Sequence, residues 1–358
     1  MSFSSRIVYA AAHVVADAEA DRSPGAPAVL DWDATLAFRH RLWALGLGVA
    51  DAMDTAQRGM GLDWAATREL IRRSGAEAGS VGGLLRCGVG TDQLPGAPGS
   101  PYSLAEIGDA YEGQLAVVEQ AGALPVVMCS RALAATARGA EDYAAVYARI
   151  LGQAGRPVIL HWLGAMFDPA LRGYWGSAEL DGATDAVLEI IGEHAAKIDG
   201  IKVSLLDADR EVALRRRLPA GVRLYTGDDF NFPELIAGDE QGFSHALLGV
   251  FDPLAAQAAQ AMRLLDAGDA AGFRGVLDPL VPLARHLFAA PTRFYKTGVV
   301  FLAYLSGHQD RFTMIGGLET GRDREHLAKL YEMAAESAIF PDADLAAARF
   351  KEFQGAQR

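Results

Sequence analysis

Short apolar runs alternate with longer amphipathic segments along most of this chain, and this alternation limits the possible folds more than any other feature of the sequence. The strand-like runs are apolar throughout, which is typical of parallel strands that are covered on both faces. A helix-like segment follows each of the eight runs, which are residues 6–15, 47–55, 82–90, 124–130, 156–164, 198–206, 221–229 and 242–250. The helix after the third run begins with a capping box formed by Ser103 and Glu106. Eight strand–helix units predict an α/β fold, the (β/α)8 TIM barrel.

Two further features favour a closed barrel over an open doubly wound sheet. No glycine-rich dinucleotide fingerprint or P-loop follows the first run, and the glycine-rich stretch 88–96 lacks the lysine and the spacing of a phosphate-binding loop. After residue 253 the pattern becomes purely helical. We therefore predict a barrel over residues 1–252 and a C-terminal helical extension, packed on the barrel, over residues 253–358.

Composition excludes several classes of partner and cellular location. The formal net charge is −12 and the isoelectric point is near 5.1, which argues against a nucleic-acid partner. No apolar stretch approaches the length of a transmembrane helix, and the N-terminal apolar segment is interrupted by His13, unlike a signal peptide. Cys87 and Cys129 have neither CxxC nor zinc-site spacing, so we predict two reduced, buried thiols in a cytoplasmic protein.

A lysine lies inside the sixth apolar run, and this placement carries the strongest chemical signal. Lys202 is flanked by Ile201 and Val203, so period-two alternation turns it to the opposite face of the strand. If the two apolar residues face the helices, Lys202 faces the barrel interior, where burial favours the neutral amine. A neutral amine can condense with a ketone to form an imine. The alternative is a structural ion pair with Asp228 or Asp229.

Functional side chains in such a barrel gather at the carboxyl ends of the strands. His161 is the best candidate acid or base because imidazole titrates near neutral pH; the alternative is a core histidine bonded to the backbone. Arg131 is either a clamp for a substrate carboxylate or phosphate, or an ordinary solvated loop arginine. The pattern places these polar residues at strand ends: His13, Asp54, Thr55, Arg86, Ser130, Arg131, His161, Trp162, Lys202, Ser204, Thr226, Asp228, Asp229, Ser244 and His245.

Two stretches carry a family resemblance. "IDGIKVS" followed by "VRLYTGDDFNFPELIAGDEQGFSHAL" resembles the region around the Schiff-base lysine of the dihydrodipicolinate synthase and N-acetylneuraminate lyase superfamily of class I aldolases. The C-terminal stretch "PTRFYKTGVVFLAYLSG" and the segment after the second run are also similar to that superfamily, in particular to a divergent dihydrodipicolinate-synthase-like group of unknown function. The resemblance implies a TIM barrel, an imine on Lys202 and a homo-oligomer, either a dimer or a tetramer.

The sequence departs from the superfamily's pattern around the substrate. Its second-strand loop is Asp54-Thr55-Ala56-Gln57-Arg58, so Thr55 is the one threonine left for a catalytic role. Cys129-Ser130-Arg131 stands where the relay tyrosine belongs, and His161-Trp162 replaces a Tyr-Asn pair. Carboxylate, amide and aromatic side chains suit hydroxyls and a sugar face better than a small carboxylate. We predict substrate contacts from Asp54, Gln57, Arg131, Trp162, Asp228, Ser244 and His245.

The sequence thus predicts a lyase or aldolase that acts through Lys202, His161 and Thr55 on a ketone or 2-keto acid, with a sugar-derived compound among the candidates. No cofactor and no metal are expected, because the imine itself is the electron sink. One alternative is a metal-dependent barrel isomerase or aldolase with His161, His245, Asp228 or Asp54 as ligands. Another is a non-catalytic barrel that binds keto acids or sugars.

Overall fold

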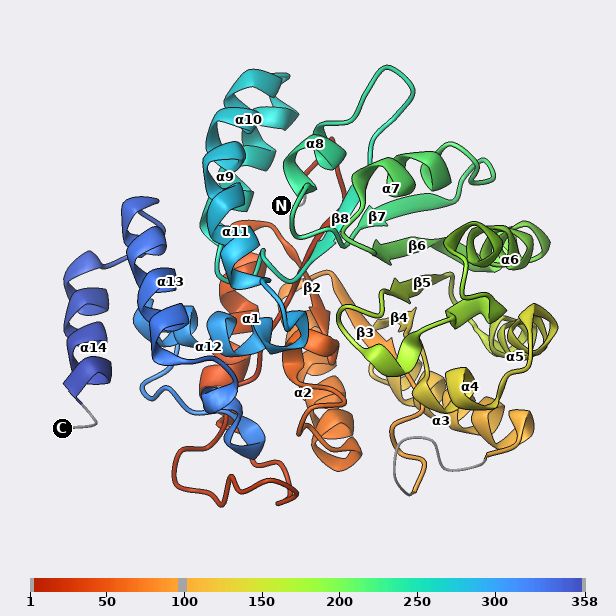
Figure 1. Cartoon of the computed structure of the whole chain (residues 1–358), viewed down its shortest axis with the longest axis horizontal. Coiled ribbons are helices and arrows are strands. Elements are labelled where there is room, and N and C mark those ends of the chain that lie inside the picture. Colours follow the sequence, from red (N-terminus) through yellow and green to blue (C-terminus); the bar gives the residue numbers. More distant parts are fainter. Residues whose placement is uncertain (1–2, 96–101, 356–358) are drawn as a thin grey trace. The chain divides into compact units, whose positions relative to one another are not determined.

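The computed structural model describes residues 3–95 and 102–355, and within them eight parallel strands form a closed barrel in the order β1 to β8 (Figure 1). The predicted (β/α)8 barrel is therefore confirmed. Nearly every strand residue is buried, as the unbroken apolar runs predicted. The strands are β1 Val8–Ala11, β2 Gly48–Asp51, β3 Leu85–Val89, β4 Leu124–Val127, β5 Val158–Leu163, β6 Ile198–Ser204, β7 Arg223–Thr226 and β8 His245–Leu248.

Helices follow the strands, and a run of helices completes the C-terminal part. The helices between strands are α1 Trp32–Leu45, α2 Trp64–Val81, α3 Leu104–Gln120, α4 Arg131–Thr136, α5 Ala140–Gln153, α6 Leu180–Glu193, α7 Ala208–Arg215 and α8 Phe232–Ala237. After β8 come α9 Ala255–Asp266, α10 Ala270–Leu277, α11 Val281–Leu287, α12 Tyr295–Leu305, α13 Arg324–Glu336 and α14 Ala343–Gly355. The capping box predicted at the start of α3 is confirmed, since Ser103 and Glu106 bond reciprocally.

The chain divides into two compact units. One consists of residues 1–67 together with residues 248–358, and contains β1, β2, α1 and the helices from α9 onward. The other, residues 68–247, contains strands β3 to β7 and most of β8, with α3, α5, α6 and α7 on their outer side (Figure 1). The boundary that we predicted at residue 252 stays a prediction.

Strand boundaries correct three of the predicted positions. Arg86 lies near the beginning of β3, and Ser244 and His245 lie at the beginning of β8, so none of the three is at a carboxyl end. The apolar runs were longer than the strands they contain, and hydrophobicity alone does not mark where hydrogen bonding to the neighbouring strand starts. His13 lies two residues beyond the end of β1.

The register of β5, β6 and β7 defines two faces. His161 pairs with Lys202, and Lys202 with Tyr225, so these three side chains share one face. The opposite face belongs to Trp162, Val203 and Thr226, and the Thr226 hydroxyl donates to Glu211 of α7. Because that second face meets a helix, the face with Lys202 is the barrel interior.

Candidate functional site

Lys202 is only 7 % exposed and lies against the turn that follows β7. A β-carbon added to Gly227 would be 2.7 Å from Lys202 Cε and 2.2 Å from Ser204 Oγ. The Gly227 amide also donates to the Val203 carbonyl at 2.8 Å, which fixes the turn beside the sixth strand. The turn therefore needs glycine, and its close approach restricts the lysine side chain to one side of the strand.

The interior on the amino-terminal side of Lys202 is filled by Tyr225. A β-carbon on Gly200 would be 2.8 Å from the Tyr225 ring, so the ring packs directly on the glycine. The Tyr225 hydroxyl donates to Asp199 Oδ2 at 2.6 Å, and the same carboxylate pairs with Arg86 at 2.9 Å. Arg86 thus belongs to an ion pair at the amino end of the strands.

His161 is the titratable residue beside Lys202 in the strand register. The imidazole is fully buried, and its Nε2 lies 3.3 Å from Ser204 Oγ. Its Nδ1 has no hydrogen-bond partner among the residues that the structure describes. Burial, and secondarily the charge of Lys202, lowers the pKa of His161 well below its usual value. His161 is therefore neutral near pH 7.

The end of β4 lacks a tyrosine of its own but receives one from a distant segment. The Ser130 amide donates to the Tyr174 hydroxyl at 3.0 Å, and the Tyr147 hydroxyl lies 3.1 Å from it. Burial raises the pKa of Tyr174 well above 10, so its hydroxyl keeps its proton. The strand pattern of the sequence does not point to Tyr174, because this residue lies in the loop after β5. The signal that the sequence offers is the pair of glycines, Gly173 and Gly176, that flank "YW".

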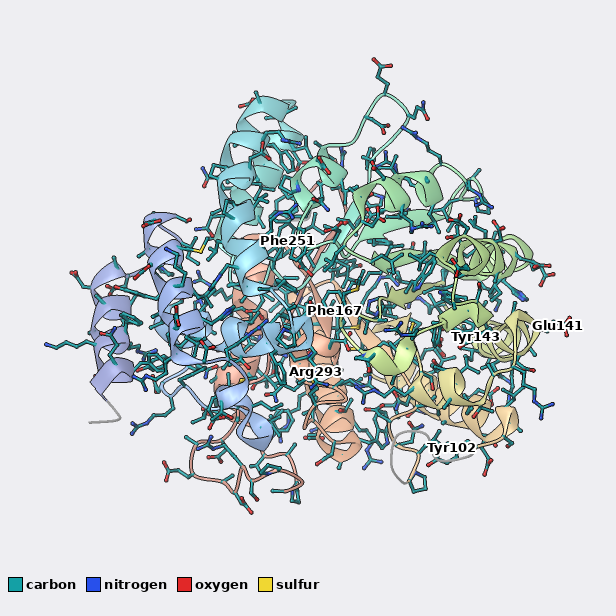
Figure 2. The ribbon with its side chains drawn as sticks, viewed as in Figure 1. Tyr102, Glu141, Tyr143, Phe167, Phe251 and Arg293 are labelled. Atoms are coloured by element: carbon teal, nitrogen blue, oxygen red, sulfur yellow. The ribbon has the colours of Figure 1, made fainter. Side chains whose placement is uncertain are left out.

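An aromatic cluster supports this tyrosine from the helix side. Trp175 follows it with a positive φ of 70° and is fully buried, an unusual conformation for a tryptophan. Its ring packs against Tyr147 at 4.8 Å between centroids. Tyr143 of α5 contacts the Tyr174 ring at 4.7 Å, and Figure 2 shows Tyr143 pointing inward while Glu141 of the same helix points outward.

Cys129 and Arg131 flank Ser130 at the same strand end. The Cys129 thiol is half-buried and donates to the His161 carbonyl at 3.0 Å. The predicted fully buried thiol is therefore wrong for Cys129 and right for Cys87. Arg131 Nε donates to Asp168 Oδ2 at 2.5 Å, so this guanidinium has an internal carboxylate partner.

Three of the predicted substrate contacts have other partners. Trp162 faces the helices and packs edge-on against Trp175, because adjacent residues of a strand point to opposite sides. The Ser244 hydroxyl donates to Glu211 at 2.8 Å on that same outer side. Asp228 accepts from the Phe230 and Asn231 amides at 2.9 and 3.0 Å, so its carboxylate shapes its own turn. The substrate contacts predicted for Trp162, Ser244 and Asp228 stay predictions, and His245 packs its ring near Tyr225.

In the unit that contains β2, the predicted loop residues are bound internally. Thr55 Oγ1 lies 2.8 Å from the Tyr295 hydroxyl. Gln57 Nε2 donates to the carbonyls of Met60 and Ile315, and its amide oxygen accepts from the Ile315 amide. The amide of Gln57 is thus bonded to backbone, and its predicted substrate contact stays a prediction. Asp54 begins a short 3-10 helix, Asp54–Ala56, and is half-buried.

The same unit holds a buried histidine–aspartate pair. His13 Nδ1 lies 2.8 Å from Asp252 Oδ2, and that oxygen also accepts from the His13 amide at 2.7 Å. His13 Nε2 has no partner within the described part of the chain. Arg39, which is fully buried, binds the His13 carbonyl and pairs with Asp51 through two bonds. His13 is thus held by charged residues of its own unit.

The described part of the chain contains neither a cluster of metal-ligating side chains nor a helix that could span a membrane. Across 3–95 and 102–355, no group of three or more His, Cys, Asp or Glu side chains is arranged to hold a metal ion. His161, His245, Asp228 and Asp54, the ligands of the metal-dependent alternative, therefore do not form such a group within the described residues. Nor does any helix described there have the length and apolarity needed to cross a membrane.

Solved structures share this fold at low sequence identity. Dihydrodipicolinate synthase from Aquifex aeolicus matches with a TM-score of 0.71 at 14 % identity, over 94 % of this chain and 99 % of that one. YagE is a prophage protein of the dihydrodipicolinic acid synthase family from E. coli K12, solved in complex with pyruvate. It matches with a TM-score of 0.72 at 14 % identity, over 93 % of this chain and 99 % of that one. The 4-hydroxy-tetrahydrodipicolinate synthase of Methylacidiphilum fumariolicum SolV matches with a TM-score of 0.68 at 16 % identity, over 95 % of this chain and 99 % of that one.

These matches show that the barrel is the one found in dihydrodipicolinate synthases, as the sequence resemblance implied. No curated protein matches the sequence. A family model does match, over residues 1–357, and its description is "Protein of unknown function (DUF993)". The chain therefore belongs to the DUF993 family.

Proposed function

We propose that this protein is a Schiff-base-forming class I lyase or aldolase that acts on a ketone or 2-keto acid through Lys202. The observation that carries the proposal is a lysine on the interior face of a barrel strand, nearly buried, beside a neutral imidazole. Desolvation penalises the charged form of any amine, and the neutral form is the nucleophile. The solved structures with this fold include dihydrodipicolinate synthase and 4-hydroxy-tetrahydrodipicolinate synthase, and this likeness supports the proposal.

The reaction that we propose begins with addition of Lys202 Nζ to the carbonyl carbon. The carbonyl oxygen takes one proton from the attacking amine and a second from solvent and leaves as water, which forms a protonated imine between the lysine and the substrate. In C–C cleavage the imine accepts the electron pair of the breaking bond, while a base takes the proton from the hydroxyl of the departing carbonyl fragment. In C–O cleavage the imine accepts the electron pair of the neighbouring C–H bond as its proton is removed, and the enamine formed then expels the hydroxyl group as water. We assign the proton transfer of this step to His161, because it lies beside Lys202 in the strand register and its Nδ1 lacks a partner among the described residues.

The choice of substrate now rests on fewer residues than the sequence suggested. A sugar-derived compound was favoured by Asp54, Gln57, His161 and Trp162, but Gln57 binds backbone and Trp162 faces the helices. Asp54 and His161 still favour a hydroxylated carbonyl compound over plain pyruvate. We therefore propose a ketone or 2-keto acid as the substrate class, with hydroxylated members to be compared directly with pyruvate.

Trapping with borohydride tests the proposal. The protein is incubated with pyruvate and a panel of hydroxylated keto compounds, reduced, and digested with trypsin. Because trypsin cleaves after lysine and arginine, alkylation of Lys202 should replace the peptides 198–202 and 203–210 with one peptide, 198–210, heavier by the reduced substrate. Lys296, which is also buried, serves as the matched control lysine. Adducts on surface lysines only, with Lys202 unmodified for every compound, would rule the proposal out.

A further inference from the structure

Glu211 is a buried carboxyl group behind the interior site. It lies on α7, is 1 % exposed, and both of its oxygens accept hydrogen bonds from hydroxyls. Thr226 Oγ1 donates to Oε2 at 3.0 Å, and Ser244 Oγ donates to Oε1 at 2.8 Å. A buried carboxyl group is costly unless it is bonded in this way, so its presence calls for an explanation.

One of these two bonds leads to Lys202. Thr226 Oγ1 also accepts from the Asp228 amide at 3.1 Å, so one hydroxyl joins Glu211 to the turn after β7. Gly227, the residue between them, is the one whose added β-carbon would be 2.7 Å from Lys202 Cε. The other bond, from Ser244, leads to the start of β8, where the Ser244 amide donates to the Leu235 carbonyl.

The charges around Glu211 come from the turn and from its own helix. Burial raises the pKa of Glu211 to about 8; the Ser244 bond opposes this shift, and the negative charge of Asp228 adds to it. The Thr226 bond and the positive charge of Arg215 lower the pKa by smaller amounts. Arg215 also pairs with Asp239 at 2.9 Å, and this pairing limits how far its positive charge lowers the pKa of Glu211. A second negative charge near Asp228 therefore forms as the pH rises toward 8.

We propose that Glu211 is a positioning residue for Lys202 that acts through Thr226 and the Gly227 turn, and that ionisation of Glu211 loosens this turn. The inference rests on the proposed function of Lys202. With Glu211 protonated, Asp228 and Asp229 are the carboxyl groups of the turn, and the Thr226 hydroxyl links the helix to the turn. With Glu211 ionised, its negative charge repels that of Asp228, and this repulsion shifts the turn away from the lysine.

The test follows the reactivity of Lys202 without assuming any substrate. Reductive methylation with formaldehyde and dimethylamine–borane, followed by peptide mapping, gives the modification rate of Lys202 relative to Lys296 at each pH. Four proteins are compared: the wild type and the variants Glu211→Gln, Thr226→Val and Ser244→Ala. Glu211→Gln keeps the shape and cannot ionise, and Ser244→Ala removes a bond to the same carboxyl group but not the link to the turn.

In the wild type, the pH profile of the relative methylation rate should show an inflection near pH 8, in addition to the one caused by titration of the amine itself. The Glu211→Gln variant should lack the inflection near pH 8. Thr226→Val should change the rate at pH 7 by roughly tenfold, since small displacements of a reacting group have large effects, and Ser244→Ala should change it far less. Identical pH profiles for the wild type and Glu211→Gln, or equal effects of Thr226→Val and Ser244→Ala, would overturn the inference. Failure of every keto compound to label Lys202 with borohydride would instead refute the proposed function, since the methylation profile does not depend on it.

Discussion

Gly227 and Lys202 are in such close contact that a single methyl group on the glycine would lie 2.7 Å from the lysine Cε. The contact joins the turn after β7 to the sixth strand and sets the direction of the amine. A lysine that is fixed in this way presents its nitrogen to one region of the barrel interior, as imine formation requires.

The first prediction concerns Gly227→Ala. The new β-carbon must displace the Lys202 side chain or the turn, so borohydride trapping at Lys202 should fall by at least roughly tenfold, with a stability loss of about 1–3 kcal/mol. Trapping yield and urea unfolding measure the two effects. Gly192→Ala on α6 is the control, because nothing lies within 4 Å of its added β-carbon and trapping should be unchanged. Equal trapping by both variants would show that the contact does not position the lysine.

The second prediction concerns Lys202→Met. Methionine keeps the length of the side chain and removes an amine that is costly to bury, so the protein should be as stable as the wild type or more stable. Activity and trapping should be lost completely. Thermal unfolding and the trapping assay check both points, and Lys296→Met should retain trapping. A large loss of stability in Lys202→Met would indicate that the lysine is a structural ion-pair partner instead.

The third prediction is a pH dependence from His161. Its pKa in the folded protein lies well below the usual 6.5, so the unfolded chain binds the proton more readily. Stability from this residue is fully present above pH 6.5 and is lost as the pH falls below that value. Urea unfolding between pH 5 and pH 7 should show a steeper decline for the wild type than for His161→Gln. Parallel curves for the two proteins would contradict the neutral, buried imidazole.

The fourth prediction concerns Glu211, for which the change of stability with pH has the opposite sign to that of His161. Its folded pKa of about 8 exceeds the ordinary value of 4.5, so the folded state holds the proton more tightly. The stability that it contributes is fully present below pH 4.5 and is lost as the pH rises toward 8. Glu211→Gln should therefore gain stability relative to the wild type over this interval, as measured by urea midpoints. A constant difference across the interval would mean that Glu211 is ionised throughout.

The fifth prediction is that thorough chelation leaves activity unchanged, because an imine supplies the electron sink that a Lewis acid supplies elsewhere. Activity is measured on the best trapped substrate before and after EDTA and dialysis. Loss of activity that zinc or magnesium restores would favour the metal-dependent alternative over the imine.

The sequence by itself determined the barrel, the capping box and the face of Lys202. Each of these follows from a local rule: eight strand–helix repeats, a three-residue spacing between Ser103 and Glu106, and the period-two alternation that separates Lys202 from Val203. Local rules depend on residues close in the chain, so they can be followed without coordinates.

The tertiary structure alone decided which polar side chains meet. Glu211 bonds to Thr226, 15 residues away in the chain, and to Ser244, 33 residues away. The hydroxyl of Tyr174 bonds to the Ser130 amide, 44 residues away. The sequence suggested that the Gln57 amide could bind a hydroxyl, but in the structure this amide donates to the Ile315 carbonyl. A buried polar group bonds to whatever the packing of helices and strands brings within about 3 Å, and the distance along the sequence places no limit on that choice.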